Sequence, residues 1–277
     1  MVKDGVKKIN KAFKSTPTKR KITQSLMKDF SDYLLGKECG LVIKAKYFDG
    51  VVFPSTDAMK LGHYFEYQAT NQLPKYGDIP EPVKVYKGTA KEDFSTDYKR
   101  ANESALFYKK LIKEFDIEVL STGKTITSGF MEGTLDVLAN VNGRRAIIDL
   151  KYSGLIDNLW SPMGWHEDSL AENEGHMIQA VHYTLLERLD SNADVDFYFW
   201  VFNTKNPEDM RIYQIIIEES RFDMHLHSVY ETRKRIMGIA KAKSWKAYPS
   251  PLKCSQCPLV NTCKHKKLLP EPIKIYY

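Results

Sequence analysis

The spacing of apolar and polar residues predicts an ordered series of helices and strands. Apolar residues at helical spacing predict helices at about 23–35, 55–73, 101–115, from 179 onward and at about 221–245. Runs rich in β-branched and aromatic residues predict strands at 117–122, 130–141, 144–152, 196–203 and 210–218. Residues 41–53 are expected to form a short strand or an irregular segment, and residues 74–100 a connection. This order predicts an α/β core in which helices flank a mixed sheet.

Asn142 and Gly143 stand between two of these strands and predict a tight hairpin. Both residues tolerate the positive φ angles of a type I′ turn. The hairpin would place Asp136 and Asp149 on neighbouring strands, where their carboxylates can converge. Lys151 follows Asp149 by two residues, so strand alternation points both side chains to the same face of the sheet. The sequence therefore predicts two acids and one lysine side by side.

The apolar neighbours of the two acids suggest what this group does. A carboxylate inside a hydrophobic run is costly unless it is paired or binds a metal ion. Oxygen ligands suit Mg²⁺ or Mn²⁺, and a nearby ammonium can orient or activate a water molecule. The alternative is that Asp136 and Asp149 are ordinary acids at strand ends and that Lys151 is their solvated partner.

Composition and charge suit a soluble protein that binds nucleic acid. The chain has 277 residues, 43% of them hydrophobic and 27% charged, enough for one large domain or a core with an appended subdomain. The net charge of +6 is uneven, because residues 1–22 carry +7 and residues 221–277 carry +9, which leaves −10 for the middle. Basic ends can bind phosphates while central acids hold a metal ion, although Lys-rich ends also favour solubility alone.

The ends of the chain suggest its location and its division into parts. No apolar run approaches about 18 residues, and the N-terminus lacks the apolar core of a signal peptide. We expect a cytoplasmic protein with no membrane partner, with an organellar presequence as the alternative. The predicted parts are a basic flexible arm at 1–22, a core with its N-terminal helical segment at 23–220, and a basic helix with a cysteine-rich segment at 221–277.

The order of the acidic motifs resembles the PD-(D/E)xK nucleases, and within them the RecB-like branch. Asp136 matches the first acid and Asp149-Leu150-Lys151 the D-x-K motif, although Leu135 stands where the pattern has proline. The resemblance implies a restriction-endonuclease-like core and a nuclease that depends on Mg²⁺ or Mn²⁺.

Two predicted helices carry further residues that the resemblance assigns to the site. RecB-like families place a metal-directed Glu or His four residues after a helical glycine. Gly62 stands four residues before Glu66, and His63 is the competing metal ligand. A Gln-x-x-x-Tyr helix follows the D-x-K strand in these nucleases, and Gln179 with Tyr183 has that spacing. One face of a helix can present both side chains to the site.

The cysteines predict a second metal site. Three form a C-x2-C-x5-C motif near the C-terminus and the fourth precedes the core: Cys39, Cys254, Cys257 and Cys263. Clustered thiols in an intracellular protein favour metal ligation over disulfides. The pattern resembles the iron–sulfur RecB-like nucleases, including AddB and the CRISPR-associated ones, and implies a 4Fe–4S cluster that joins the two ends of the chain. Gly40 stands where proline often follows the first cysteine. The alternative is Zn²⁺ bound by the clustered cysteines and His265.

The expected activity is hydrolysis of phosphodiester bonds in DNA, as an exonuclease acting on single strands or free ends. Three lysines beside the last cysteine are expected to contact DNA: Lys264, Lys266 and Lys267. In the long segment 154–175, Trp160 and Trp165 either stack on unpaired bases or fix the segment to the protein body. The alternative function is a catalytically weak, nuclease-like DNA-binding subunit that is active only with a helicase, recombinase or integrase partner.

Overall fold

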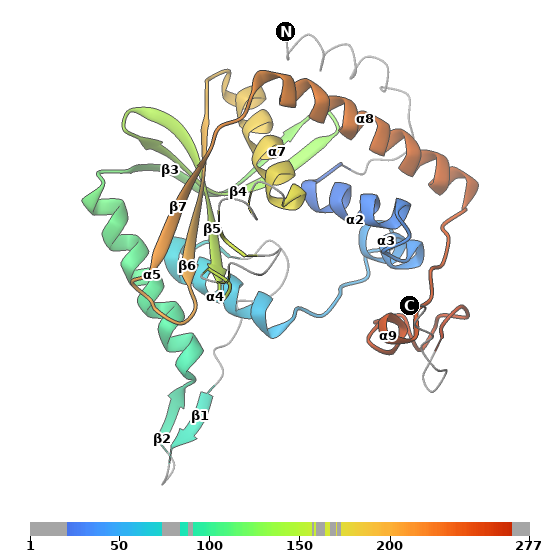
Figure 1. The fold of residues 1–277 in the computed structure, drawn as a ribbon, viewed down its shortest axis with the longest axis horizontal. Helices are drawn as coiled ribbons and strands as arrows, with labels where there is room; N and C mark the ends of the chain where they lie inside the picture. Colours follow the sequence, from blue (N-terminus) through green and yellow to red (C-terminus); the bar gives the residue numbers. More distant parts are fainter. Residues whose placement is uncertain are drawn as a thin grey trace. The chain divides into compact units, whose positions relative to one another are not determined.

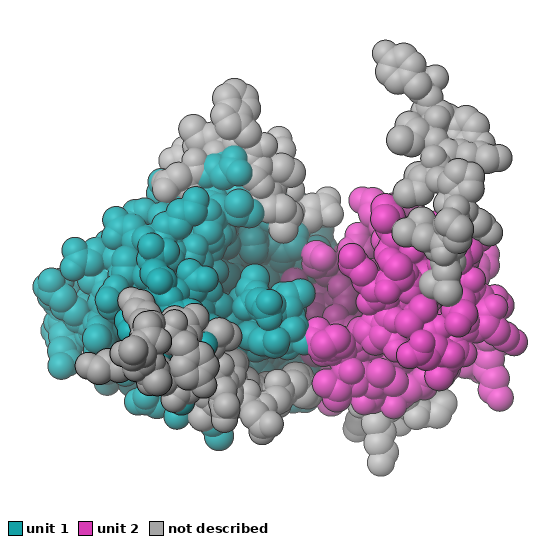
Figure 2. Space-filling model, turned by 90° about the horizontal axis from the view of Figure 1, so that it is seen from below, with its two compact units in different colours: residues 1–7, 55–225 teal, residues 8–54, 226–277 magenta. Residues whose placement is uncertain are grey.

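The computed structural model describes residues 21–73, 84–87, 91–156, 158, 164–166, 170 and 173–267. Contacts divide these residues into two compact units, one of residues 55–225 and the other of 21–54 with 226–267 (Figure 2). Most of the predicted basic arm at 1–22 lies outside the described residues. No described helix combines the length and apolar character that crossing a membrane requires.

A five-stranded sheet forms the centre of the unit made by residues 55–225 (Figure 1). Its strands, in spatial order, are β3 (Glu118–Ser128), β4 (Met131–Val141), β5 (Arg144–Ser153), β6 (Asp196–Asn203) and β7 (Met210–Ile215). β5 and β6 run parallel, and the other neighbours are antiparallel. The predicted α/β core with a mixed sheet is therefore confirmed. The segment predicted as a connection contains a small hairpin of β1 (Lys84–Lys87) and β2 (Lys91–Phe94).

Three helices pack on this sheet and define its two faces. α4 (Asp57–Thr70) and α5 (Thr96–Glu114) share a hydrophobic core with Val137, Ile148 and Trp200 of the central strands. α7 (Glu174–Ser191) contacts β3, β4 and β6. Asp149 alternates with Ile148 along β5, and its side chain contacts Gln179 of α7. Asp149 therefore stands on the face of the sheet that α7 covers.

The turn between β4 and β5 has the predicted geometry. Asn142 and Gly143 have φ angles of 52° and 75°, the positive values that a type I′ turn needs. Val141 pairs with Arg144 across the turn, and the pairing extends from there along both strands. The turn thus sets the register of the hairpin, and the register decides which residues face each other at its far end.

The second unit combines the first helices of the described chain with the C-terminal segment. Its elements are α2 (Gln24–Leu34), α3 (Gly40–Tyr47), the later part of α8 (Glu219–Ala242) and the short α9 (Pro251–Ser255). The rings of Phe30, Tyr33 and Trp245 pack with centroids 5.7 to 6.4 Å apart. By these contacts residues 23–54 group with the C-terminal segment, whereas the sequence-based division places them with the core.

The prediction of a strand or irregular segment at 41–53 was wrong for residues 41–47, which belong to α3, while residues 48–53 are irregular. Adjacent β-branched residues such as Val42 and Ile43 favour a strand locally. The helix instead buries Ile43 and Tyr47, which stand four residues apart on one of its faces. Burial of this face therefore overrides the local preference.

The glycine after Cys39 has a steric reason in this unit. The Gly40 N–H donates a 2.9 Å hydrogen bond to the Lys246 carbonyl oxygen. A Cβ at Gly40 would come within 2.6 Å of that oxygen and of the Tyr33 ring. Proline would in addition lack the N–H donor. Glycine at this position therefore permits a direct backbone contact between the start of α3 and the segment after α8.

Candidate active site

Two aspartates stand at the end of the pairing between β4 and β5. The last paired residues are Val137 and Ile148, and Asp136 and Asp149 face each other one position further along. Asp136 Oδ2 accepts a 2.8 Å hydrogen bond from the Leu150 backbone N–H. A side-chain oxygen thus replaces a backbone acceptor at this point of the ladder. The hairpin register brings the two carboxylates together, as the turn sequence predicts.

Asp149 is the most deeply buried acid of this group, with its side chain only 1% exposed. Its Oδ1 accepts a 2.6 Å hydrogen bond from Gln179 Nε2. Its Oδ2 forms an ion pair with the Lys151 ammonium. Burial raises the pKa of Asp149, and Lys151 and Gln179 lower it in part because they stabilise the carboxylate. The predicted pair Asp149 and Lys151 and the predicted Gln179 therefore meet at one carboxyl group.

Glu66 of α4 adds a third carboxylate to the same electrostatic group. Burial raises the pKa of Glu66 and the charge of Asp149 raises it further, while Lys151 lowers it. Burial also raises the pKa of Asp136 well above its usual value, and the charges of Asp149 and Glu66 add to this rise. The three carboxylates repel one another when they are ionised. A bound divalent cation would stabilise their ionised form.

His63, the alternative to Glu66, lies one turn earlier on α4 and is half-buried. The electrostatic interactions with Asp136 and Asp149 belong to Glu66. This arrangement favours Glu66 over His63 as the residue of α4 that joins the two aspartates, while the choice of metal ligand stays a prediction.

Lys151 carries a positive charge in these surroundings. Burial favours the neutral amine, but Asp149, Asp136 and Glu66 outweigh this effect and raise the pKa of Lys151. A lysine with a raised pKa is a poor proton acceptor near neutral pH. Its chemistry is therefore electrostatic, through its charge and its N–H donors. The ammonium also lies over the ring of Phe199 on β6, 5.7 Å from the ring centroid.

α7 presents Gln179 and Tyr183 to this group with their spacing of four residues. Burial and then the charges of Asp149 and Asp136 raise the pKa of Tyr183, so its phenol stays protonated and can donate a hydrogen bond. The ring lies against Gly133 of β4, where an added Cβ would come within 2.9 Å of it. Gly133, three residues before Asp136, therefore provides the space that Tyr183 occupies.

Comparison with known proteins assigns the fold to a family. A family model described as a PDDEXK-like domain of unknown function (DUF3799) matches residues 24–266. The chain belongs to this PDDEXK-like family. The predicted PD-(D/E)xK superfamily is thereby confirmed, while the narrower iron–sulfur RecB-like branch stays a prediction. No curated protein matches the chain.

Several solved structures are similar to the chain at low sequence identity. A protein from Eubacterium rectale, provisionally described as an exonuclease, is 16% identical with a TM-score of 0.60, and the match covers 92% of this chain and 91% of that one. A phage-related exonuclease from Haemophilus somnus 129PT is 15% identical with a TM-score of 0.48, covering 85% and 100%. An alkaline exonuclease from Laribacter hongkongensis is 12% identical with a TM-score of 0.44, covering 81% and 93%. The Eubacterium rectale structure shows that the chain has the fold of that protein.

The donor set of the PDDEXK-like site suits a hard divalent cation. Among the described residues no three Cys, His, Asp or Glu side chains are gathered in a form ready to hold a metal ion. At the acids, Lys151 and Gln179 contact the two oxygens of Asp149, and the Leu150 N–H donates to one oxygen of Asp136. Asp149 Oδ2 is buried without a hydrogen bond of good geometry. That oxygen and the free lone pairs of Asp136 are the donors that Mg²⁺ prefers.

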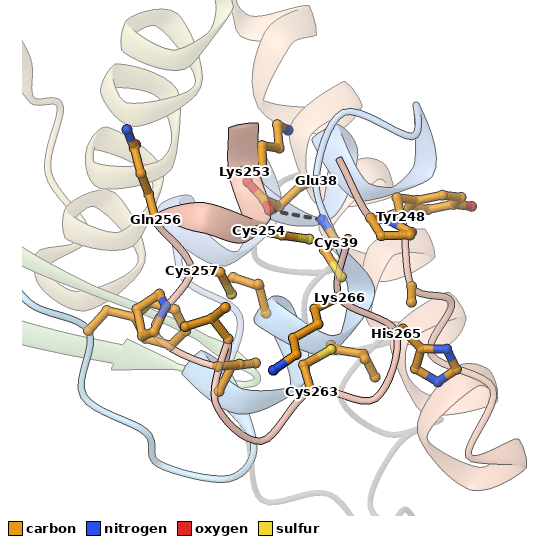
Figure 3. A pocket seen from close by; sticks show the side chains of 18 residues that line it. Glu38, Cys39, Tyr248, Lys253, Cys254, Gln256, Cys257, Cys263, His265 and Lys266 are labelled. Carbon is orange, nitrogen blue, oxygen red and sulfur yellow. Dashed lines mark hydrogen bonds between the residues drawn. The ribbon is translucent and has the colours of Figure 1, made fainter. Parts of the chain in front are cut away.

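The four cysteines line one pocket of about 300 Å³ in the second unit (Figure 3). Their side chains come from the residue before α3, from α9, and from the turns that follow α9: Cys39, Cys254, Cys257 and Cys263. None of them forms a disulfide. Burial raises the pKa of the Cys257 thiol, and the other three cysteines contribute to the rise through their charges. The fold thus places the distant first cysteine beside the clustered three.

Other predicted residues of this region lie at or near the same pocket. His265 and Lys266 line it, and Lys264, Lys266 and Lys267 are exposed. His265, the zinc alternative, therefore shares the pocket with the cysteines. Because no three metal-binding side chains of the described residues form a ready site here either, the 4Fe–4S cluster and Zn²⁺ stay predictions.

Two contacts of the active site are not predicted from the sequence. Gly133 carries a signal, since it stands in a strand three residues before an acid, where glycine often marks a close approach. Phe199 carries no such signal, because its position depends on the parallel register of β5 with β6, which pairs it with Asp149.

Of the two tryptophans, Trp165 is buried and packs against the body, as the second alternative for it predicts, and Trp160 lies outside the described residues.

Proposed function

We propose that this protein is a deoxyribonuclease that depends on a divalent metal ion and acts as an exonuclease. The observation that carries the proposal is the group of one buried and two half-buried carboxylates beside a charged lysine, at the end of a β-hairpin in a PDDEXK-like fold. A binding protein gains nothing from buried acids that face a polyanion, because they repel it. The provisional description of the Eubacterium rectale protein as an exonuclease supports the exonuclease part.

Each residue of the group has a defined part in the proposed reaction. Asp136 and Asp149 would hold Mg²⁺ or Mn²⁺, with Glu66 as a further ligand and His63 as its alternative. Such an ion, when bound, polarises the phosphate and lowers the pKa of a water molecule. Lys151 stabilises the negative charge that develops on the phosphate, because its ammonium stays charged. Gln179 orients Asp149, and the protonated phenol of Tyr183 is a donor for the phosphate or the water.

The second part of the proposal concerns the cysteine pocket. Cys39, Cys254, Cys257 and Cys263 would hold a 4Fe–4S cluster; the alternative is Zn²⁺ bound by the three clustered cysteines and His265. The shared pocket of the four thiols supports this part. Either metal would be structural and would connect α3 with the segment around α9. The exposed Lys264, Lys266 and Lys267 beside the pocket would contact the DNA backbone.

The nuclease proposal is tested with end-labelled linear DNA, single- and double-stranded, in the presence of Mg²⁺ or Mn²⁺ and with a chelator as the blank. We expect release of mononucleotides from free ends and no cleavage of closed circular DNA. Asp149→Asn and Lys151→Ala should each lower the rate by about a thousandfold or more while DNA binding is retained. Asp194→Asn is the matched control, because its side chain is 87% exposed.

Full activity of Asp149→Asn or Lys151→Ala would contradict the proposed active site. DNA binding without hydrolysis in the wild type, reversed by an added helicase, recombinase or integrase, would instead support the subunit alternative. The cluster is tested separately by the absorption spectrum and the iron and zinc content of anaerobically purified protein. A band near about 400 nm with about four irons per chain is the expected result, and one zinc per chain would support the alternative.

A further inference from the structure

The proposed catalytic lysine has a second neighbour besides the acids. Parallel pairing of β5 with β6 places Phe199 directly beside Asp149, so the side chains at 149, 151 and 199 share one face of the sheet. The Lys151 ammonium lies over the Phe199 ring, 5.7 Å from its centroid. This distance is within the range of about 6 Å in which a cation is attracted by the face of an aromatic ring.

A lysine needs such a contact more than most catalytic groups do. Its side chain has four flexible carbon–carbon links and ends in a compact charge. The Lys151 side chain is 25% exposed, so an ion pair with Asp149 alone leaves a path toward solvent. The face of Phe199 attracts the ammonium and so adds a second contact to the ion pair.

The Phe199 ring is itself held in a fixed orientation. It is fully buried, and three rings approach it nearly edge to face: Phe197 at 4.9 Å, Trp165 at 5.5 Å and His176 at 5.5 Å between centroids. Aromatic pairs prefer this arrangement, since the positive edge of one ring meets the negative face of the other. Contacts from three directions prevent the ring from turning its face away from Lys151.

Trp165 connects this ring to the segment between β5 and α7. Its indole packs against His176 at the start of α7, with centroids 4.5 Å apart and the ring planes tilted by 32°. Its carbonyl oxygen accepts hydrogen bonds from the Tyr213 hydroxyl at 2.5 Å and from Arg211 Nη1 at 3.3 Å, both on β7. Backbone and ring of Trp165 are thus fixed at once, and the fixed ring supports Phe199.

We propose that Phe199 is a positioning residue for Lys151, with its ring face holding the ammonium beside Asp149 and with Trp165 and His176 fixing the orientation of the ring. This inference rests on the proposed nuclease function, because it assigns Phe199 to the step in which Lys151 acts. Positioning matters most in the transition state, so the contact should affect kcat more than KM for DNA.

The test changes the electron density of the ring and leaves its shape nearly constant. Phenylalanine with one, two or three ring fluorines is introduced at position 199, since each fluorine weakens the attraction of the ring face for a cation. We expect kcat to fall stepwise to a total of about two- to thirty-fold, with little change in KM. The same series at Phe222 of α8 is the matched control, because that ring is also buried and also carries a cation over its face, the Arg188 guanidinium, outside the proposed active site.

Conventional variants give an independent check. Phe199→Tyr should retain most of the activity because it keeps the ring face, whereas Phe199→Leu should lower kcat even where its melting temperature equals that of Phe222→Leu. A flat fluorine series at position 199, or equal losses of activity at 222 and 199, would overturn the proposal.

Failure of the positioning role and failure of the nuclease function give different results. Carbon-13 relaxation of Lys151 Cε, assigned with Lys151→Arg, reports the mobility of the side chain without any cleavage. Phe199→Leu should increase this mobility and Phe222→Leu should not. A wild type that never cleaves DNA refutes the function, while unchanged Cε mobility in Phe199→Leu refutes the positioning role by itself.

Discussion

A buried pair of histidines makes the stability of the sheet unit depend on pH. His182 on α7 and His225 on α8 are both buried, with 2.9 Å between His182 Nδ1 and His225 Nε2. His182 Nε2 lies 3.0 Å from the Glu132 carbonyl oxygen, which can only accept a hydrogen bond. His182 therefore donates from Nε2 and accepts at Nδ1, and His225 donates from Nε2. Both rings are neutral and satisfied in this arrangement.

The pKa values of the pair give the sign and size of the effect. Burial lowers the pKa of His182 to about 4. Burial and the neighbouring His182 lower the pKa of His225 to about 3. Unfolded histidine has a pKa near 6.5, so between that pH and the folded values the unfolded state binds more protons and stability falls as the pH falls. At about pH 5 an unfolded imidazole is protonated about 30 to 1, which corresponds to about 2 kcal/mol per ring.

The assay compares urea unfolding at about pH 7.5 and about pH 5. His225→Gln removes one titrating ring and keeps a group that can donate a hydrogen bond to His182. Between the two pH values the wild type should lose about 2 kcal/mol more stability than this variant. The raised pKa values of the acidic group affect both proteins equally and cancel in the difference. His227→Gln, exposed on the same helix, should behave as the wild type. Equal losses in wild type and His225→Gln would refute the reasoning.

Three further predictions follow from the active site. Asp136→Asn should abolish cleavage yet raise the melting temperature of the metal-free protein in calorimetry, because it removes a carboxylate whose ionised form is disfavoured by burial and by Asp149. Mg²⁺ should raise the melting temperature of the wild type more at about pH 8 than at about pH 5, because protons compete for acids with raised pKa values. Gly133→Ala should lower the cleavage rate about tenfold, because its Cβ would displace the Tyr183 ring; Gly62→Ala, which meets no atom within 4 Å, should leave the rate unchanged.

The parts of the site that the sequence predicts are those set by short-range rules. A two-residue turn fixes the hairpin register, and the register alone brings Asp136 to Asp149. Strand period then adds Lys151, and helix period joins Gln179 with Tyr183. These relations need only local geometry, so they can be derived without knowing how β6 or α4 packs.

The parts that the sequence does not predict depend on contacts between distant segments. Phe199 reaches Lys151 only because β6 pairs with β5 in parallel, a register that no turn sequence encodes. α3 forms although Val42 and Ile43 favour extended backbone, because the burial of one face of the helix outweighs that preference. The grouping of α2 and α3 with the C-terminal segment likewise comes from ring contacts such as Tyr33 with Trp245. Tertiary packing overrides propensity in each case.

The two proposed metal sites are built from separate parts of the chain, so the two proposals can be tested independently. Glu66, Asp136, Asp149 and Lys151 all belong to residues 55–225, and the contacts that hold them are strand pairing, α4 and α7 within that unit. The four cysteines all belong to the other unit, where Gly40 and Lys246 already join its two segments through a backbone hydrogen bond. Metal at the cysteines would therefore stabilise the unit that contains them. The nuclease proposal can be tested on protein that lacks iron and zinc, and the cluster proposal can be tested on protein that does not cleave DNA.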